Sequence, residues 1–330
     1  EAVRGSVGAS EVANFANHKF TGKGAKAFLN RVLAGRIPGP GRVNLTPMLL
    51  ESGKLNGDLT VACIDEETFY LFGSSVAQNM HLRWFEMHLE GVQDVVYQNM
   101  TDDFHGIAIS GPNSRELLSR LTREDVSSET FKFRDIRDTF IGGVPALCTR
   151  ISFTGELGYE IYVAPQYQLK LFEAIEELGV DLNLKWFGGR ALMSMRLEKS
   201  WGAWTMDFRP DFTIMESGLD FFVDWDKDFI GKKAALIEKN NGPSKKLSVI
   251  QIDTETDVSG DEAVMHNGEC VSYITSGGYG HSVKKSLAMT YLPVELIDSN
   301  VRLEVEILGK FYKASIVMEP LYDPSGSKMR

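Results

Sequence analysis

A single carboxylate interrupts an otherwise apolar strand in the stretch SFTGELGYEIYV. The turn Thr154 to Gly158 leads into a strand-like run, Tyr159 to Val163, in which Glu160 is the charged residue and the two tyrosines are assigned to packing. A carboxylate held on a strand accepts two parallel N–H donors at once, as it does from a guanidinium. Glu160 is therefore a candidate ligand-binding residue, and the alternative is a solvent-facing glutamate on the polar side of a two-faced strand.

A second carboxylate, Asp58, opens the strand-like run Asp58 to Ile64 directly after the pair Asn56-Gly57. Asn-Gly is a turn-type pair, so Asp58 is either a turn residue or a functional group. In the functional case its negative charge would favour a cation that develops nearby during a reaction.

Other kinds of site find little support. The three cysteines are widely spaced, and the six histidines form no cluster with metal-ligand spacing. The Gly-rich stretch Thr275 to Ser286 has neither the spacing of a phosphate-binding loop nor the third glycine of a dinucleotide fingerprint, so we interpret it as a loop between strands. We predict no metal site, and no flavin or nicotinamide site of the fingerprint type in this chain.

The net charge of the chain limits the kinds of partner that are expected. The 330 residues carry a net charge of −10, and nucleic acids and anionic membranes both need a basic face, so neither is expected as the main partner. No apolar run approaches the length of a membrane span. The chain opens on Glu1 without the pattern of a signal peptide, and we interpret it as a piece of a longer or processed protein.

Two segments resemble each other. Thr21 to Leu33 aligns without gaps onto Ser110 to Thr122, each after a short strand-like run, and Pro112 is expected at a first helical position. Chance recurrence of strand-glycine-helix joints is the alternative, but the match favours a duplicated strand-helix unit.

The rest of the chain predicts an α+β fold with a small β-barrel at its C-terminal end. Strands are expected at Asp58 to Ile64, Phe69 to Gly73, Val144 to Phe153 and Tyr159 to Val163, and helices at Val76 to Leu89 and after Pro165, where Leu171, Phe172, Ile175 and Leu178 share a face. Lys239 to Lys246 is interpreted as a linker, followed by short, regularly spaced strands. The domains are therefore expected at 1–243, the α+β part, and 244–330, a closed barrel or sandwich.

Several segments, in order, resemble the tetrahydrofolate-binding aminomethyltransferase family, which includes the glycine-cleavage T-protein. They are SFTGELGYEIYV, LESGKLNGDLTV, SGPNSRELL, ESGLDFFV with DFIGKKAAL, and YITSGGYGHSVKKSLAMTYLP. The segment ALMSMRLEKSWGAW and the ending EPLYDPSGSKMR are more similar to the C-terminal half of dimethylglycine and sarcosine dehydrogenases.

The resemblance implies roles for particular residues. It implies that Glu160 binds the pterin edge, that Phe153 packs against the pterin, and that Asp58 orients the reacting folate and assists proton movement. Ser75 lies where the family has a polar contact. Arg190 is a candidate for the anionic glutamate tail, because the family's arginine aligns with Leu192. Arg196 is assigned to structure, and Trp201 and Trp204 to packing or to a channel mouth.

The function implied is one-carbon transfer that forms 5,10-methylenetetrahydrofolate from an iminium or aminomethyl carbon. The chain would be the folate half of a dimethylglycine or sarcosine dehydrogenase-like protein, with tetrahydrofolate and a small methylated amine as partners. FAD would be bound only by a flavin domain upstream. The alternatives are a stand-alone aminomethyltransferase or folate-dependent demethylase, and a non-catalytic regulatory protein that keeps the fold. The bacterial cytoplasm or the mitochondrial matrix is the expected compartment.

Overall fold

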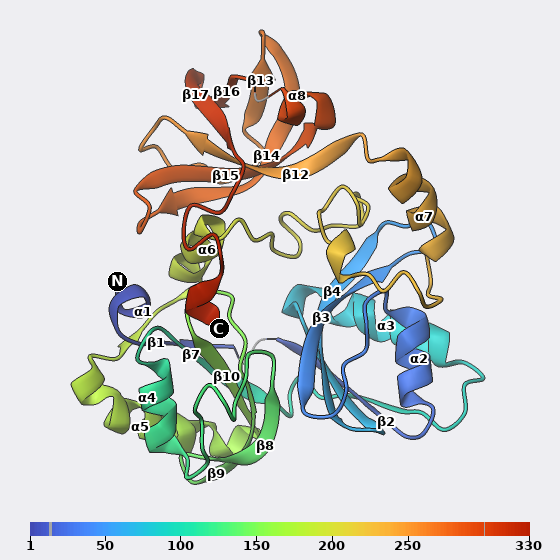
Figure 1. Ribbon diagram of the computed structural model, residues 1–330, viewed down its shortest axis with the longest axis vertical. Helices are drawn as coiled ribbons and strands as arrows, with labels where there is room; N and C mark the ends of the chain where they lie inside the picture. The colour runs from blue at the N-terminus through green and yellow to red at the C-terminus, as the bar shows by residue number, and fades with distance from the viewer. Residues whose placement is uncertain (13–14, 300) are drawn as a thin grey trace.

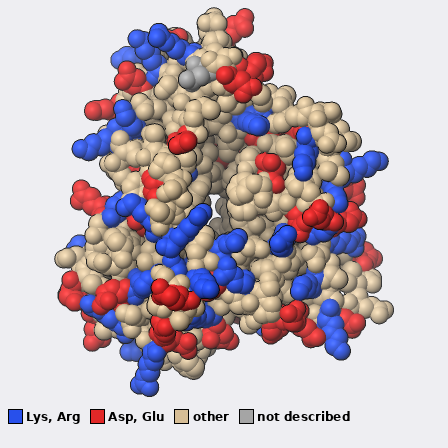
Figure 2. All heavy atoms as spheres, in the orientation of Figure 1, with Lys and Arg blue, Asp and Glu red and all other residues tan. Residues whose placement is uncertain are grey.

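The computed structural model describes residues 1–12, 15–299 and 301–330. Two lobes, each built on a β-sheet covered by helices, lie side by side, and a β-barrel lies above them (Figure 1). The lobes surround a central hollow (Figure 2). The predicted α+β fold with a C-terminal barrel is confirmed.

The first lobe contains a sheet with the strand order β11-β1-β7-β10-β9-β8. Only the short pairing of β1 with β11 is parallel among the described pairings of this sheet. The strands are β1 (Gly8–Glu11), β7 (His105–Ser110), β8 (Ile136–Ile141), β9 (Val144–Thr149), β10 (Gly158–Val163) and β11 (Lys185–Trp186).

The second lobe contains a sheet with the strand order β3-β4-β5-β2-β6. Its strands are β2 (Ala16–Thr21), β3 (Arg42–Leu49), β4 (Leu55–Asp65), β5 (Thr68–Gly73) and β6 (Val96–Asn99). The predicted pair of strands at Asp58 to Ile64 and Phe69 to Gly73 is confirmed, because β4 and β5 pair antiparallel.

The barrel closes in the order β12-β15-β14-β13-β16-β17. Its strands are β12 (Lys245–Ile252), β13 (Ala263–His266), β14 (Glu269–Gly280), β15 (Lys285–Pro293), β16 (Leu303–Ile307) and β17 (Lys310–Val317). The prediction of a loop at Thr275 to Ser286 was wrong, because most of this stretch is paired strand. Its glycines allow close packing: a Cβ at Gly277 would lie 2.9 Å from the Cβ of Val258.

The duplicated strand-helix unit is confirmed. Strand β2 leads to helix α2 (Ala25–Val32), and β7 leads to helix α4 (Ser114–Leu121). Gly22 and Gly111 occupy the same place in the two copies with φ of 109° and 131°, and a Cβ at either would lie within 2.4 Å of a backbone oxygen. Pro112 is not at the first helical position, since Asn113 is the N-cap of α4.

The remaining helices lie on the sheets, between the lobes and the barrel, or beside the barrel. They are α1 (Ala2–Gly5), α3 (Gln78–Leu89), α5 (Gln168–Gly179), α6 (Gly189–Glu198), α7 (Lys232–Asn241) and α8 (Val294–Asp298). Short 3₁₀ turns are η1 (Ser75–Ala77), η2 (Pro165–Tyr167), η3 (Val180–Leu182), η4 (Asp220–Phe222) and η5 (Ser327–Met329). No helix in the described residues is long and apolar enough to cross a membrane.

Several boundaries and one face differ from the sequence predictions. The strand expected at Val144 to Phe153 ends at Thr149. The helix expected from Val76 begins at Gln78, after η1. On α5, Leu171 and Ile175 are buried, but Phe172 is exposed and stacks on the Trp186 ring at the sheet edge. The linker expected at Lys239 to Lys246 is limited to residues 242–244, because α7 and β12 include the other residues.

Candidate functional site

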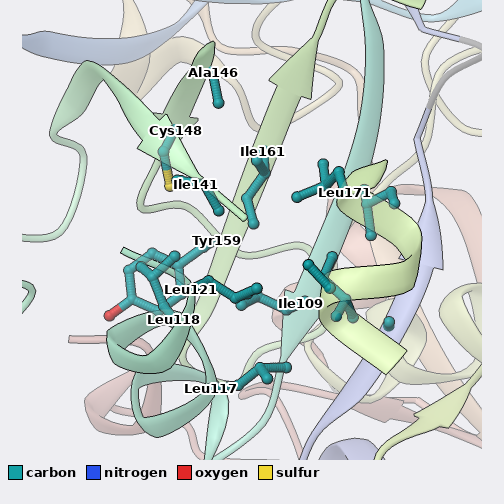
Figure 3. Packing of buried hydrophobic residues seen from close by; sticks show 14 of the residues in the cluster. Ile109, Leu117, Leu118, Leu121, Ile141, Ala146, Cys148, Tyr159, Ile161 and Leu171 are labelled. Carbon is teal, nitrogen blue, oxygen red and sulfur yellow. The ribbon is translucent and has the colours of Figure 1, made fainter. Parts of the chain in front are cut away.

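Strand β10 is buried on both faces, which explains its apolar composition. Tyr159 and Ile161 pack beneath α4 and α5, where Figure 3 shows them beside Leu118 and Leu171. Because side chains alternate along a strand, Glu160 and Tyr162 point to the opposite face. That face contacts the second lobe, since the Tyr162 ring stacks on Phe72 of β5 with centroids 4.4 Å apart.

Strand β4 of the second lobe also has one face in the core of its lobe and one face toward the other lobe, and Asp58 lies on the latter. Leu59 and Val61 pack into the core beneath α2 and α3, whereas Ala62 belongs to the cluster that contains Tyr162. Asp58 shares the face of Ala62 by strand alternation. Asp58 and Glu160 therefore project from the facing sides of two sheets, a relation that their separation in the sequence does not reveal.

Glu160 has one oxygen held and one oxygen free. The Tyr162 hydroxyl donates a 2.6 Å hydrogen bond to Oε2 of Glu160, and Oε1 has no hydrogen-bond partner in the described part of the chain. Burial raises the pKa of Glu160, and the hydrogen bond from Tyr162 opposes that rise. Oε1 can accept a hydrogen bond from an N–H group of a ligand. In a fully solvated glutamate, water would compete for this position.

Asp58 has surroundings suited to proton exchange near neutral pH. Burial raises its pKa from 3.8 to about 7. No side chain among residues 1–12, 15–299 and 301–330 donates a hydrogen bond to its carboxyl, and its cross-strand neighbour on β3 is Pro47. A group that gains and loses a proton near the working pH is an effective general acid or base. The turn interpretation of Asp58 was wrong, because the residue lies within β4.

Tyr162 belongs to the candidate site through its contact with Glu160, and the sequence interpretation missed it. It packs as expected, but its hydroxyl also binds Glu160. Burial and the neighbouring carboxyl raise its pKa well above the ordinary value, so the hydroxyl keeps its proton and remains a donor. The period of two along a strand places residues 160 and 162 on one face, and this signal could have identified the pair.

The other predicted site residues lie outside this carboxylate pair. The Phe153 ring stacks on Trp201 at 6.0 Å, in the connection between β9 and β10. Ser75 begins η1 after the end of β5, and Arg190 is exposed in the first turn of α6. Within the described residues no hydrogen bond or ion pair joins Ser75 or Arg190 to the carboxylates, so their roles remain predictions.

The turn before β10 is fixed by a buried ionic cluster. Arg4 donates to the carbonyl of Thr154 at 2.7 Å and to Glu156 Oε1 at 3.1 Å, and it pairs with Glu198 Oε2 at 2.6 Å. The Tyr322 hydroxyl donates to the same oxygen of Glu156. Arg4 and Glu156 together thus join the N-terminal helix, α6 and the C-terminal segment to the turn before the strand that carries Glu160.

A second buried ion pair holds the segment that follows α6. Arg196 and Asp207 lie 2.6 Å apart and are almost inaccessible to solvent, and Arg196 also donates to the carbonyl of Trp201 at 2.9 Å. Asp207 accepts further hydrogen bonds from Thr275 and Ser276 of β14. The pair fixes Trp201, and with it the partner ring of Phe153, against the barrel.

Most of the chain matches two known domain families. Residues 1–227 match the GCVT N-terminal domain, and residues 245–323 match the glycine cleavage T-protein C-terminal barrel domain. The aminomethyltransferase T of the glycine cleavage system from Bartonella henselae shares the fold, with a TM-score of 0.88 and 23% identity over 98% of this chain and 88% of that chain.

Two kinds of curated relative are similar in sequence. Mitochondrial dimethylglycine dehydrogenase of Mus musculus is 36% identical over 319 residues, which are 96% of this chain but 37% of that protein. An aminomethyltransferase from a Thermoanaerobacter species is 30% identical over 334 residues, 99% of this chain and 89% of that protein. The chain thus spans little more than a third of the dehydrogenase and most of the transferase.

Proposed function

The chain belongs to the glycine cleavage T-protein family, and we propose that it transfers a one-carbon unit to tetrahydrofolate, forming 5,10-methylenetetrahydrofolate from an iminium or aminomethyl carbon. The observation that supports this most directly is Glu160, a half-buried strand carboxylate with one oxygen bound to Tyr162 and the other without a partner in the described part of the chain. It faces the sheet that carries Asp58, the second carboxylate of the proposed site.

Glu160 recognises the pterin edge in this proposal. The pterin presents a ring N–H beside an exocyclic NH2, and a carboxylate accepts from both when it is ionised. Tyr162 supports the ionised form by donating to Oε2. The Phe153 ring packs against the pterin, the Ser75 hydroxyl supplies a polar contact, and the exposed Arg190 attracts the anionic glutamate tail.

Asp58 moves protons in this proposal. When a carbon is taken from an iminium, N5 and N10 of the folate each form a bond to it and each lose a proton, and both protons end on the departing amine. No oxidant is consumed. A carboxyl with a pKa of about 7 accepts and releases a proton at neutral pH, and its ionised form favours the cationic iminium nearby.

The setting that we favour is the folate half of a dimethylglycine or sarcosine dehydrogenase-like protein. The support is the 36% identity to dimethylglycine dehydrogenase over 96% of this chain. In such a protein a separate flavin domain would bind FAD and oxidise the amine to the iminium. A stand-alone aminomethyltransferase is the second candidate, because those relatives match over 89% of their length. Supplying dimethylglycine and sarcosine to the full natural protein distinguishes the two candidates, since only a dehydrogenase consumes either amine.

Calorimetry with tetrahydrofolate tests the proposal. Glu160→Gln removes a charged acceptor, worth about 1.5–3 kcal/mol, so we expect binding about 10- to 150-fold weaker than in the native chain. Glu173→Gln, an exposed glutamate on α5, is the matched control and leaves the affinity unchanged. A native chain that does not bind tetrahydrofolate contradicts the function. Equal affinity of the native and Glu160→Gln proteins contradicts the role of Glu160.

A further inference from the structure

Two buried histidines lie behind strand β4, on the side away from the Asp58 side chain. His18 comes from β2 and His81 from α3, and both are almost inaccessible to solvent. Their ring centroids are 6.2 Å apart in an edge-on arrangement. We propose that His81, supported by His18, is a positioning residue that holds the backbone beside Asp58 for the proposed one-carbon transfer.

His81 contacts the backbone immediately before Asp58. Its Nε2 lies 2.9 Å from the carbonyl oxygen of Asn56, two residues before Asp58. Gly57, between them, makes the approach possible, because a Cβ there would lie 2.7 Å from Nε2 of His81. The imidazole therefore lies directly against the strand segment from which the Asp58 side chain projects on the other face.

The contact fixes the protonation pattern of His81. A carbonyl oxygen only accepts, so Nε2 of His81 carries the proton and donates to Asn56. Burial lowers the pKa of His81 to about 4, so the ring is neutral near pH 7 and Nδ1 is a bare acceptor. Nδ1 is buried and has no partner among the described residues.

His18 supplies the complementary group. The Tyr97 hydroxyl lies 2.9 Å from Nδ1 of His18, and burial lowers the pKa of His18 to about 3. When Tyr97 donates to Nδ1, the proton of His18 resides on Nε2, which is also buried and unpartnered within the described part of the chain. The two remaining atoms of the pair are then a donor on His18 and an acceptor on His81. The rings make no direct hydrogen bond, and a water between these two atoms would join Tyr97, His18, His81 and Asn56 into one polarised chain.

The arrangement suits the proposed reaction for two reasons. It restrains the Asn56-Gly57 peptide, so that the Asp58 carboxyl keeps one orientation toward the facing sheet. It also adds no charge behind Asp58, because both rings are neutral. A displacement of about 1 Å in a reacting group costs on the order of a hundredfold in rate, so loss of this restraint is expected to lower turnover.

A matched pair of variants tests the proposal, which rests on the proposed function. His81→Gln keeps an N–H near the position of Nε2, whereas His81→Leu is similar in size and has no donor. We expect kcat for one-carbon transfer to tetrahydrofolate to fall about tenfold or more in His81→Leu and less than about threefold in His81→Gln. The Kd for tetrahydrofolate of both variants should stay within about threefold of the native value. His88→Leu, on the same helix without contact to the β4 carbonyl, is the control with native kcat.

Three results overturn the inference: native kcat in His81→Leu, an equal loss in both His81 variants, or a loss confined to folate affinity. If His81→Leu does not fold, ¹⁵N NMR of the native histidines decides, because an Nδ1–H tautomer of His81 contradicts the chain of hydrogen bonds and an Nε2–H tautomer supports it. A native protein that does not bind tetrahydrofolate contradicts the proposed function instead, and the tautomer then tests the positioning contact independently.

Discussion

Replacing Asp58 by asparagine changes how the stability of the protein depends on pH. The carboxyl has an ordinary pKa of 3.8 when the chain is unfolded and about 7 in the folded protein. Between these values the folded state retains a proton that the unfolded state has lost. Native stability therefore falls as the pH rises from about 4 to about 7 and is constant above that range.

The size of the effect follows from the same two values. A difference between 3.8 and about 7 corresponds to about 4 kcal/mol at 1.36 kcal/mol per pH unit. Because Asp58 is partly accessible to solvent, we expect about half of that or less. From pH 5 to pH 8, the native chain is then expected to lose about 1–2 kcal/mol of stability that Asp58→Asn retains.

Urea unfolding of both proteins at pH 5 and pH 8, followed by tryptophan fluorescence, measures this difference. Glu67→Gln, in the turn that follows the same strand, is the control, because the side chain is exposed and makes no hydrogen bond in the described residues. Equal pH dependence of the native and Asp58→Asn proteins would refute the account of Asp58 as a half-buried carboxyl that keeps its proton up to a pH of about 7. Asp58→Asn also lacks the acid-base group, so loss of one-carbon transfer with retained folate binding is expected.

Two further substitutions test the surroundings of the site. Tyr162→Phe removes the donor that opposes protonation of Glu160, so the pKa of Glu160 is expected to rise further. Folate affinity, measured by calorimetry, should then fall more steeply below neutral pH than in the native chain. Parallel pH profiles of the two proteins would argue against a role of Tyr162 in keeping Glu160 ionised. Asp207→Asn leaves the buried Arg196 guanidinium without its counter-charge and is expected to lower the free energy of unfolding in urea by about 3–5 kcal/mol. The double variant Asp207→Asn with Arg196→Met should recover part of this loss. Equal stability of the single and double variants contradicts the charge argument.

The sequence alone determined the local features of this protein. Hydrophobic periodicity and turn residues identified most strands and helices, and the match of Thr21 to Leu33 with Ser110 to Thr122 identified the duplicated unit. These signals depend on neighbouring residues, so they survive without knowledge of the fold. The ordered motifs pointed to the correct family for the same reason, and they singled out Glu160 and Asp58.

The local signals failed where a distant segment decides the outcome. The glycines of Thr275 to Gly280 indicated a loop, but the chain packed against them requires a strand without side chains. Phe172 has the spacing of a core residue, but the Trp186 ring at the sheet edge gives it a partly exposed position. Both errors come from packing between segments that the local pattern does not contain.

Only the tertiary structure decided how the candidate site is assembled. It placed Asp58 and Glu160 on facing sheets, and it put His81 of α3 against the carbonyl of Asn56. It also separated the two glutamates of the TGELGYE motif, since Glu156 pairs with Arg4 while Glu160 keeps a free oxygen. The physical reason is that burial, counter-charges and hydrogen-bond partners come from residues far away in the chain, and these set what each carboxylate can do.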